Sequence, residues 1–372
     1  MGQLLSRSTQ STAQIPILIL GATGYIGGSV LSRLLAHPDV ERFEITALVR
    51  SAEKAERLRE LGVKTVIGST DDAEKLETLA SQAHIVFSMV DADDLAAIQT
   101  ILRGLKKRHD TSSDIPILIH TSGAAVLGDQ AKGLHDSDVI YDDTNFEQIE
   151  ALPPSQPHHD VDIAIVEADK QGYLKSYIVV PSLVHGIASG PLVDIGIQNP
   201  FSMQIPGFIL AGLDRGQVGM VGEGRAIWSN VHIDDVANLF LVLFDTILSN
   251  PEKVGHGSEG YFFAENGEHT WYDLSKAIGE ALVQAGLSKD SEPTSLTDDE
   301  LIKYTGSVER GEQMGTNARC RANKARALGW NPTKTSQDMF DGLNLQVDAL
   351  VKAMQAKQQK ASTSLHHIPE ID

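Results

Sequence analysis

Ile17-Leu18-Ile19-Leu20-Gly21-Ala22-Thr23-Gly24-Tyr25-Ile26-Gly27 joins a short apolar run to three glycines with the spacing G-x-x-G-x-x-G. The run 17–20 predicts a buried parallel strand, and the pattern from 25 to 36 predicts a helix that ends before His37-Pro38. The first two glycines let the backbone turn tightly and approach a pyrophosphate, and the third lets the helix pack closely on the strand. Backbone N–H groups at the helix N-terminus attract the phosphates. The stretch therefore predicts a dinucleotide-binding site.

Strands and helices continue to alternate after this loop. We expect further strands at 44–49, 64–68, 84–90 and 115–120, with helices between them at 52–61, 73–80 and about 93–108. This β-α-β-α order is typical of a parallel sheet with helices on both faces. The sequence therefore predicts an α/β protein with a Rossmann-type, doubly wound parallel sheet.

The regular alternation ends beyond Gly128. The stretch 135–157 is acidic and contains prolines, which favours a long loop on the active-site side. We expect a helix at 158–171, strands at 177–181 and 261–263, a strand-turn-helix unit at 231–244 and an amphipathic helix at 271–285. The predicted organisation is a flexible tail at 1–14, a dinucleotide-binding domain at 15–185 continued by about 229–263, a small discontinuous C-terminal substrate lobe at 186–228 and 264–355, and a flexible tail at 356–372.

The chain is strongly acidic, with 31 Lys and Arg against 50 Asp and Glu in 372 residues and a formal net charge of −19. This balance argues against a nucleic-acid partner, because binding phosphates requires clustered Lys and Arg. Cys320 is the only cysteine, so the chain cannot form an intramolecular disulfide, and a reducing, cytoplasmic location is expected. No apolar run reaches membrane-spanning length.

The N-terminus carries a short modification pattern. Met1-Gly2-Gln3-Leu4-Leu5-Ser6 fits the pattern M-G-x-x-x-[ST] of N-myristoylation at Gly2. The same residues also fit a disordered extension before the first strand. A single acyl chain without a second anchor binds membranes weakly, so stable membrane insertion is not expected even of a modified chain.

Three motifs in the same order resemble those of the extended or atypical short-chain dehydrogenase/reductase superfamily, which includes NAD-dependent epimerases and dehydratases. They are the glycine loop 21–27, His120-Thr121-Ser122-Gly123 after the fifth expected strand, and Val231-His232-Ile233-Asp234-Asp235-Val236-Ala237. The resemblance covers most of residues 15–345, and the stretch 261–268 resembles a fungal-type branch of these proteins. It implies a nicotinamide cofactor, a small-molecule substrate and, as one assembly open to the chain, a homodimer.

The end of the second expected strand bears on the choice of cofactor. In NAD-binding Rossmann units an acidic residue there takes the ribose 2′-hydroxyl, whereas this strand ends in Arg50, with Lys54 just beyond. Arg50 could bind a 2′-phosphate, so NADP is favoured and NAD stays open; the other interpretation of Arg50 is a surface residue. The resemblance implies that Asp71 contacts the adenine, although a solvated turn acid fits equally. The expected cofactor contacts are Gly21, Thr23, Gly24, Tyr25, Ile26, Gly27, Arg50, Asp71, Ser88 and Pro181.

The resemblance is weakest in the catalytic residues. Ser122 occupies the superfamily's serine position, but no Tyr-x-x-x-Lys follows between Ser122 and Tyr177. His158 and Asp162 stand four apart where tyrosine and lysine would stand, and so share one face of the expected helix. An imidazole can exchange protons at neutral pH without a lysine, and Asp162 could orient it. The competing interpretation makes both residues capping and surface groups at a helix start.

The remaining candidates come from loops. Tyr141 lies in the acidic stretch 138–143 and could swing over the nicotinamide, although nearby acids would raise the pKa of its phenol. A metal site is not expected, because the histidine pairs 158–159 and 366–367 lack ligand partners at usable spacing. Arg225 is a candidate for gripping an anionic substrate, but it, Trp228 and the stretch 198–201 also fit packing and turn roles.

Two functions remain open after these observations. The first is an oxidoreductase or epimerase acting on a carbonyl or hydroxyl of a small molecule, in which Ser122 binds the oxygen and His158 exchanges the proton. The second is a catalytically inactive NAD(P)-sensing regulator that acts through a protein partner, as in the nitrogen-metabolite-repression branch of the superfamily. The missing Tyr/Lys pair favours the regulator, and the full-length C-terminal lobe favours the enzyme.

Overall fold

The computed structural model describes the backbone of residues 14–365 and the side chains of residues 14–356. The myristoylation pattern at Gly2 and the expected flexible tail before residue 14 lie outside the described residues. No helix within residues 14–365 is both long enough and apolar enough to cross a membrane.

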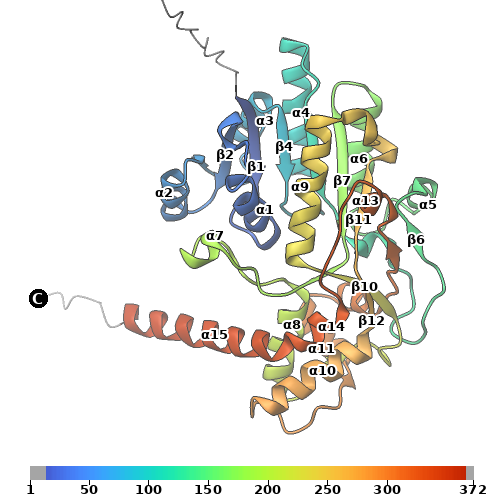
Figure 1. Cartoon of the computed structure of the whole chain (residues 1–372). Helices are drawn as coiled ribbons and strands as arrows, with labels where there is room; N and C mark the ends of the chain where they lie inside the picture. Colours follow the sequence, from blue (N-terminus) through green and yellow to red (C-terminus); the bar gives the residue numbers. More distant parts are fainter. Residues whose placement is uncertain (1–13, 366–372) are drawn as a thin grey trace, which may run out of the picture.

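A seven-stranded parallel sheet forms the centre of the molecule (Figure 1). Its order is β3-β2-β1-β4-β5-β7-β11, and every neighbouring pair is parallel. The strands are β1 (Ile15–Leu20), β2 (Phe43–Val49), β3 (Lys64–Ile67), β4 (Ile85–Ser88), β5 (Ile117–Thr121), β7 (Lys175–Pro181) and β11 (Tyr261–Ala264). The predicted Rossmann-type sheet is confirmed.

Helices cover both faces of this sheet. On one face α1 (Tyr25–Leu35) packs against α9 (Ile233–Ser249); on the other, α4 (Leu95–Ser112) lies between α3 (Ala73–Gln82) and α6 (His159–Lys170) (Figure 1). The α2 helix (Ala52–Glu60) connects β2 to β3. Phe87 of β4 points toward α9, where its ring centroid lies 5.7 Å from that of Phe244. Because side chains alternate along a strand, Ser88 points toward the α4 and α6 side.

A second sheet and the helices α8, α10, α11, α14 and α15 lie beyond the carboxyl ends of these strands (Figure 1). This sheet has the order β12-β10-β8, and the helices α8, α10 and α15 contact one another. The strands of this second sheet are β8 (Leu183–His185), β10 (Ile227–His232) and β12 (Glu268–Thr270). Further helices are α7 (Pro191–Asp194), α8 (Gln204–Arg215), α10 (Trp271–Gln284), α11 (Asp298–Thr305), α12 (Val308–Glu312), α13 (Asn323–Ala327), α14 (Ser336–Asp341) and α15 (Leu343–Leu365). The boundaries between domain and lobe stay a prediction.

The expected long loop 135–157 contains regular structure. It holds the strand β6 (Tyr141–Asp142) and the helix α5 (Phe146–Glu150), and β6 pairs with β14 (Cys320–Arg321). The buried Asp143 carboxylate fixes the segment further by accepting backbone N–H groups of Phe263, Lys324 and Ala325. These partners lie more than a hundred residues away, so the local sequence does not reveal them. A second short pair joins β9 (Gly219–Met220) to β13 (Thr294–Ser295).

The C-terminal stretch also differs from the expected flexible tail. Helix α15 continues to Leu365, so residues 356–365 are helical. This stretch is rich in Ala, Lys and Gln, which are good helix formers, and contains neither Gly nor Pro. Residues 366–372 lie outside the described part of the chain.

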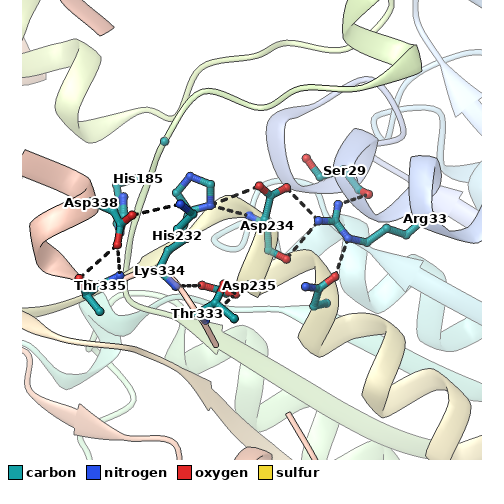
Figure 2. Close-up of polar contacts among 12 residues, drawn as sticks. Ser29, Arg33, His185, His232, Asp234, Asp235, Thr333, Lys334, Thr335 and Asp338 are labelled. Carbon is teal, nitrogen blue, oxygen red and sulfur yellow. Dashed lines mark hydrogen bonds and ion pairs between the residues drawn. The ribbon is translucent and has the colours of Figure 1, made fainter. Parts of the chain in front are cut away.

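The motif 231–237 connects three parts of the fold (Figure 2). The His232 side chain accepts the backbone N–H of Asp234 and so caps α9. The Asp234 carboxylate pairs with Arg33 of α1 at 2.9 Å. The Asp235 carboxylate accepts the backbone N–H groups of Thr333 and Lys334 at 3.1 and 2.9 Å. These contacts give the motif a structural role, because they hold α9 against α1 and against the segment that leads to α14.

Candidate functional site

The glycine loop follows β1 at the point where the strand order reverses, which is where doubly wound sheets bind ligands. Gly21 has a φ of +84°, and a Cβ there would lie 2.1 Å from the carbonyl oxygen of Met89. A Cβ at Gly27 would lie 2.1 Å from the carbonyl oxygen of Gly21. Gly24 is the N-cap of α1 and supplies no side-chain cap, which leaves backbone N–H groups of the first helical turn for a ligand.

Hydroxyl groups at the ends of two strands also fit a bound dinucleotide. Ser88 ends β4 with 1% of its surface exposed, and its hydroxyl oxygen has no hydrogen-bond partner among the described residues. The Thr121 hydroxyl at the end of β5 is likewise buried and unpartnered. Since buried polar atoms are almost always hydrogen-bonded, these two oxygens indicate a missing polar partner. A dinucleotide lying on the glycine loop would supply polar groups at this edge of the sheet.

Hydrogen bonds connect the C-terminal lobe to the same loop. The Tyr25 hydroxyl donates to the carbonyl oxygen of Gly186 at 2.6 Å. The Gln198 amide donates to the carbonyl oxygen of Tyr25, and the Asn199 N–H to that of Thr23, each at 3.0 Å. The Tyr25 hydroxyl is therefore engaged by the lobe. Cofactor contacts of Thr23, Tyr25 and Ile26 stay a prediction.

Two cationic side chains follow β2. The exposed Arg50 guanidinium makes no hydrogen bond or ion pair with another described residue, and the Lys54 ammonium likewise has no carboxylate partner there. Burial and the nearby Arg50 lower the pKa of Lys54. Asp71 is exposed and accepts a hydrogen bond from the Ser69 hydroxyl at 2.9 Å. Its contact with adenine stays a prediction.

Ser122 and Asp162 meet at the end of β5. The Ser122 hydroxyl donates to Oδ2 of Asp162 at 2.8 Å, and Asp162 is fully buried. Burial raises the pKa of Asp162 to about 7; the Ser122 hydrogen bond opposes this shift, and the charges of Asp160 and Asp93 add to it. The second carboxyl oxygen, Oδ1, has no partner among the described residues.

His158 lies directly before α6 in the left-handed conformation, with a φ of +68°. Its ring Nδ1 lies 2.7 Å from Oδ1 of Asp93, and its backbone N–H donates to the same oxygen at 2.9 Å. An ionised carboxylate only accepts, so the ring proton is assigned to Nδ1 and Nε2 keeps a lone pair. Nε2 faces Gly123, since a Cβ there would lie 3.1 Å from it. The expectation that Asp162 orients His158 is therefore wrong: Asp93 does so, and Asp162 binds Ser122.

Known proteins with similar sequences cover nearly the whole chain. Residues 14–105 match the NmrA-like family. A protein named oxidase ucsJ, from an Acremonium species, is 30% identical over 334 residues, which are 85% of this chain and 92% of that protein. An uncharacterized protein of Schizosaccharomyces pombe is 25% identical over 334 residues, covering 86% of this chain and 96% of its own length.

Solved structures share the fold at low identity. UDP-glucose 4-epimerase of Thermotoga maritima, solved with UDP-glucose, has a TM-score of 0.61 at 17% identity and covers 91% of this chain and 100% of its own. UDP-glucuronic acid 4-epimerase of Bacillus cereus, solved with UDP-glucuronic acid and NAD, has a TM-score of 0.62 at 16% identity with the same coverage. This chain belongs to the extended short-chain dehydrogenase/reductase superfamily.

Two residues of this superfamily member's site escaped the sequence reasoning. Asp93, the partner of His158, lies 65 residues away, and the only signal was an acidic cluster directly after β4. His120 is the second-last residue of β5, two residues before Ser122; its ring is buried, and neither ring nitrogen has a partner among the described residues. Burial and the nearby His158 lower the pKa of His120 to about 3, so its ring is neutral at neutral pH. His120 can therefore form hydrogen bonds with a ligand but does not act as a general acid at neutral pH.

Other expected site residues lie elsewhere in the fold. Tyr141 is held in β6, and among the described residues it forms no hydrogen bond with Ser122 or His158. The pKa of Tyr141 is raised by burial and by Asp129, not by the adjacent acids. Pro181 is buried at the end of β7 and pairs with β11.

The lobe candidates have structural partners. The exposed Arg225 pairs with Glu223 at 2.6 Å. Trp228 is buried against Trp271 and donates its ring N–H to Thr316, which agrees with a packing role. Within residues 14–356 no group of three or more His, Cys, Asp or Glu side chains is arranged to hold a metal.

Proposed function

We propose that this protein is an NADP-dependent reductase or epimerase acting on a carbonyl or hydroxyl group of a small molecule. The observation that carries the proposal is the Asp93–His158 pair beside Gly123, the residue after Ser122, at the same edge of the parallel sheet as the glycine loop. A histidine whose Nδ1 is fixed by a carboxylate presents Nε2 as a proton acceptor, and as a donor once protonated. NADP, when bound, supplies or accepts the hydride.

The protein's own groups divide the remaining work. Ser122 holds the substrate oxygen by a hydrogen bond, and His158 exchanges the proton through Nε2. His158 is one of three non-glycine residues with positive φ among the described residues, with Ser113 and Lys132, and such conformations are enriched at active sites. His120, neutral and buried, offers ring nitrogens to the bound molecules without competing for the proton.

The choice of NADP rests on the end of β2. Arg50 and Lys54 bring two positive charges together without a carboxylate partner, and this repulsion contributes to the lowered pKa of Lys54. A 2′-phosphate between them would relieve it and could bind the Arg50 guanidinium through two hydrogen bonds. The 2′-hydroxyl of NAD brings no such charge.

The solved relatives bear on the class of substrate. The two solved epimerases were determined with UDP-sugars. In this chain Arg225, the candidate anion-binding residue of the lobe, is paired with Glu223, so we keep the substrate as a small carbonyl or hydroxyl compound without assigning a nucleotide sugar. A cytoplasmic location and a homodimer stay predictions.

The second candidate function is a dinucleotide-sensing regulator. A specific observation favours it: a carboxyl group occupies the position of the usual lysine, so the usual activation of a tyrosine cannot operate. Cys320 is fully buried, and burial raises the pKa of its thiol, so the single thiol is unsuited to redox sensing. A regulator of this kind would therefore sense the dinucleotide itself.

Titration of the purified protein with NADP⁺, NADPH, NAD⁺ and NADH tests both candidates. The reductase predicts tight NADPH binding and turnover of at least one compound in a screen of carbonyl substrates. The Ser122→Ala/His158→Asn double variant should then lose that turnover while still binding NADPH. A strong preference for oxidised dinucleotides without any turnover would favour the regulator. Full activity of the double variant would contradict the assigned roles.

A further inference from the structure

Ser122 and Asp162 form an isolated buried pair. Ser122 follows the last residue of β5, Asp162 lies in the first turn of α6, and their oxygens are 2.8 Å apart. A serine hydroxyl has a single proton, and a carboxyl group has one only when it is protonated. The two residues therefore share either one proton or two, and the number decides which way the Ser122 hydroxyl points.

The two states offer different partners to a ligand. When Asp162 is ionised, its carboxylate can only accept hydrogen bonds. The Ser122 hydroxyl then donates its proton to the carboxylate and presents only a lone pair to a ligand. When Asp162 is protonated its O–H donates to Ser122, which frees the serine proton for a ligand. A carbonyl oxygen needs a donor, whereas an alcohol can donate to a lone pair.

We propose that Asp162 is a positioning residue whose protonation sets the direction of the Ser122 hydroxyl, and with it whether the site holds a carbonyl compound or the corresponding alcohol. The assignment rests on the proposed function, because it is Ser122 that binds the substrate oxygen there. No covalent bond changes in this step apart from the proton that Asp162 gains or loses to solvent.

The surroundings of Asp162 favour its neutral form near neutral pH. The groups that act on it are Ser122 at the end of β5, Asp160 on α6 and Asp93 before α4. Tyr261 of β11 faces it too, since the Asp162 charge contributes to the raised pKa of that phenol. Among the described residues no lysine or arginine contributes to the shift, so burial and two acids oppose ionisation. The unpartnered Oδ1 agrees, since burying an unpaired carbonyl oxygen costs less than burying an unpaired carboxylate.

Infrared titration of the full chain tests the coupling without any substrate. The wild-type minus Asp162→Asn difference spectrum should contain a protonated carboxyl band that disappears as the pH rises through about 7. The same titration is repeated in Ser122→Ala, with Ser122→Ala/Asp162→Asn as the reference spectrum. The midpoint of the Asp162 band should rise by about one pH unit, which is a tenfold change in proton affinity, because the hydrogen bond that stabilises the carboxylate is lost.

Asp143 is the matched control for this titration. It is also fully buried, and burial raises its pKa to about 6, but its carboxylate is bound by backbone N–H groups and not by Ser122. The Asp143→Asn difference spectrum should therefore titrate at the same pH with and without Ser122→Ala. An unchanged Asp162 midpoint in Ser122→Ala, or an Asp162 band that does not titrate, would overturn the proposal.

Binding measurements separate this proposal from the function beneath it. The measurement uses a carbonyl compound and the corresponding alcohol that the enzyme interconverts. The affinity for the carbonyl compound is measured with NADP⁺ and the affinity for the alcohol with NADPH, because neither combination can react. The carbonyl should bind about tenfold more weakly above pH 7, and the alcohol about tenfold more weakly below it. In Asp162→Asn the amide donates permanently to Ser122, and carbonyl binding should lose this pH dependence. Coupling in the infrared without any turnover would reject the reductase and keep the hydroxyl switch.

Discussion

The glycine loop and the catalytic end of this molecule lie at the same edge of one sheet, yet they follow the superfamily pattern to different degrees. At the loop, each glycine of the motif is present and in place. At the catalytic end, Ser122 occupies the superfamily's serine position. His158 and the buried Asp162 occupy the sequence positions at which the superfamily motif has tyrosine and lysine. The difference teaches that the fold constrains backbone positions far more tightly than it constrains the chemistry of side chains.

The physical reason lies in what each position touches. A Cβ at Gly21 or Gly27 would approach a backbone oxygen to 2.1 Å, and the backbone cannot give way without moving β1 or α1. Asp162 and His158 instead contact polar side chains and, in an enzyme, a ligand. Other side chains can occupy such positions whenever they satisfy the same buried polar atoms.

The largest effect is expected at the loop. Gly21→Ala should lower the free energy of unfolding by about 4 kcal/mol or more and abolish dinucleotide binding, because strain at φ +84° adds to the contact with Met89. Gly62→Ala is the matched control: its φ is +83°, but nothing lies within 4 Å, so only about 1 kcal/mol is expected. Urea unfolding and NADPH titration measure both effects. Equal costs for the two variants would show that the close contact does not matter.

The next effect concerns the buried carboxyl group. Burial raises the pKa of Asp162 from 3.8 to about 7, so between these values the folded state holds a proton that the unfolded state has released. The wild type therefore loses stability as the pH rises, by up to about 4 kcal/mol at pH 7 and above. Asp162→Asn should be more stable than the wild type by that amount at pH 8 and nearly equal to it at pH 4. Urea unfolding at both pH values checks this, and a constant difference would contradict it.

A third effect tests the catalytic end directly. His158→Asn should lower kcat by about a hundredfold, since general acid–base groups contribute that much or more. Asparagine tolerates the left-handed backbone better than most residues, so the free energy of unfolding should change little. Dinucleotide binding serves as the control and should be unchanged. Retained kcat would remove His158 from the mechanism and leave the regulator favoured.

The smallest effect is expected at the end of β2. Arg50→Glu should weaken NADPH binding about tenfold relative to NADH, because it replaces a phosphate-binding cation with a repelling charge. The matched control is Arg42→Glu, which changes the same charge before β2, where Arg42 already pairs with Asp39. Dissociation constants for both dinucleotides at one ionic strength decide the matter. An equal loss for NADPH and NADH would argue against a 2′-phosphate contact.

The sequence predicted the fold well because the decisive signals were local. The glycine loop, the alternating strands and the motif 231–237 could each be recognised within a dozen residues. The site was only half predictable. The catalytic roles of Ser122 and His158 stay a prediction, and the i to i+4 argument wrongly joined His158 to Asp162. That argument fails because His158 precedes the helix with a φ of +68°, so helical spacing does not apply to it. Asp93 could be found only from the folded chain.

The left-handed backbone at residue 158 also limits what substitutions at this site can achieve. The substitutions His158→Tyr and Asp162→Lys would give the letters of the superfamily's Tyr-x-x-x-Lys motif but not a pair on one helix face. The phenol would sit before the helix rather than on it, in a conformation that costs a bulky residue about 1–2 kcal/mol. The lysine would bury its ammonium beside Ser122, where the structure holds a carboxyl group. These two substitutions would therefore not place a tyrosine and a lysine on one face of α6.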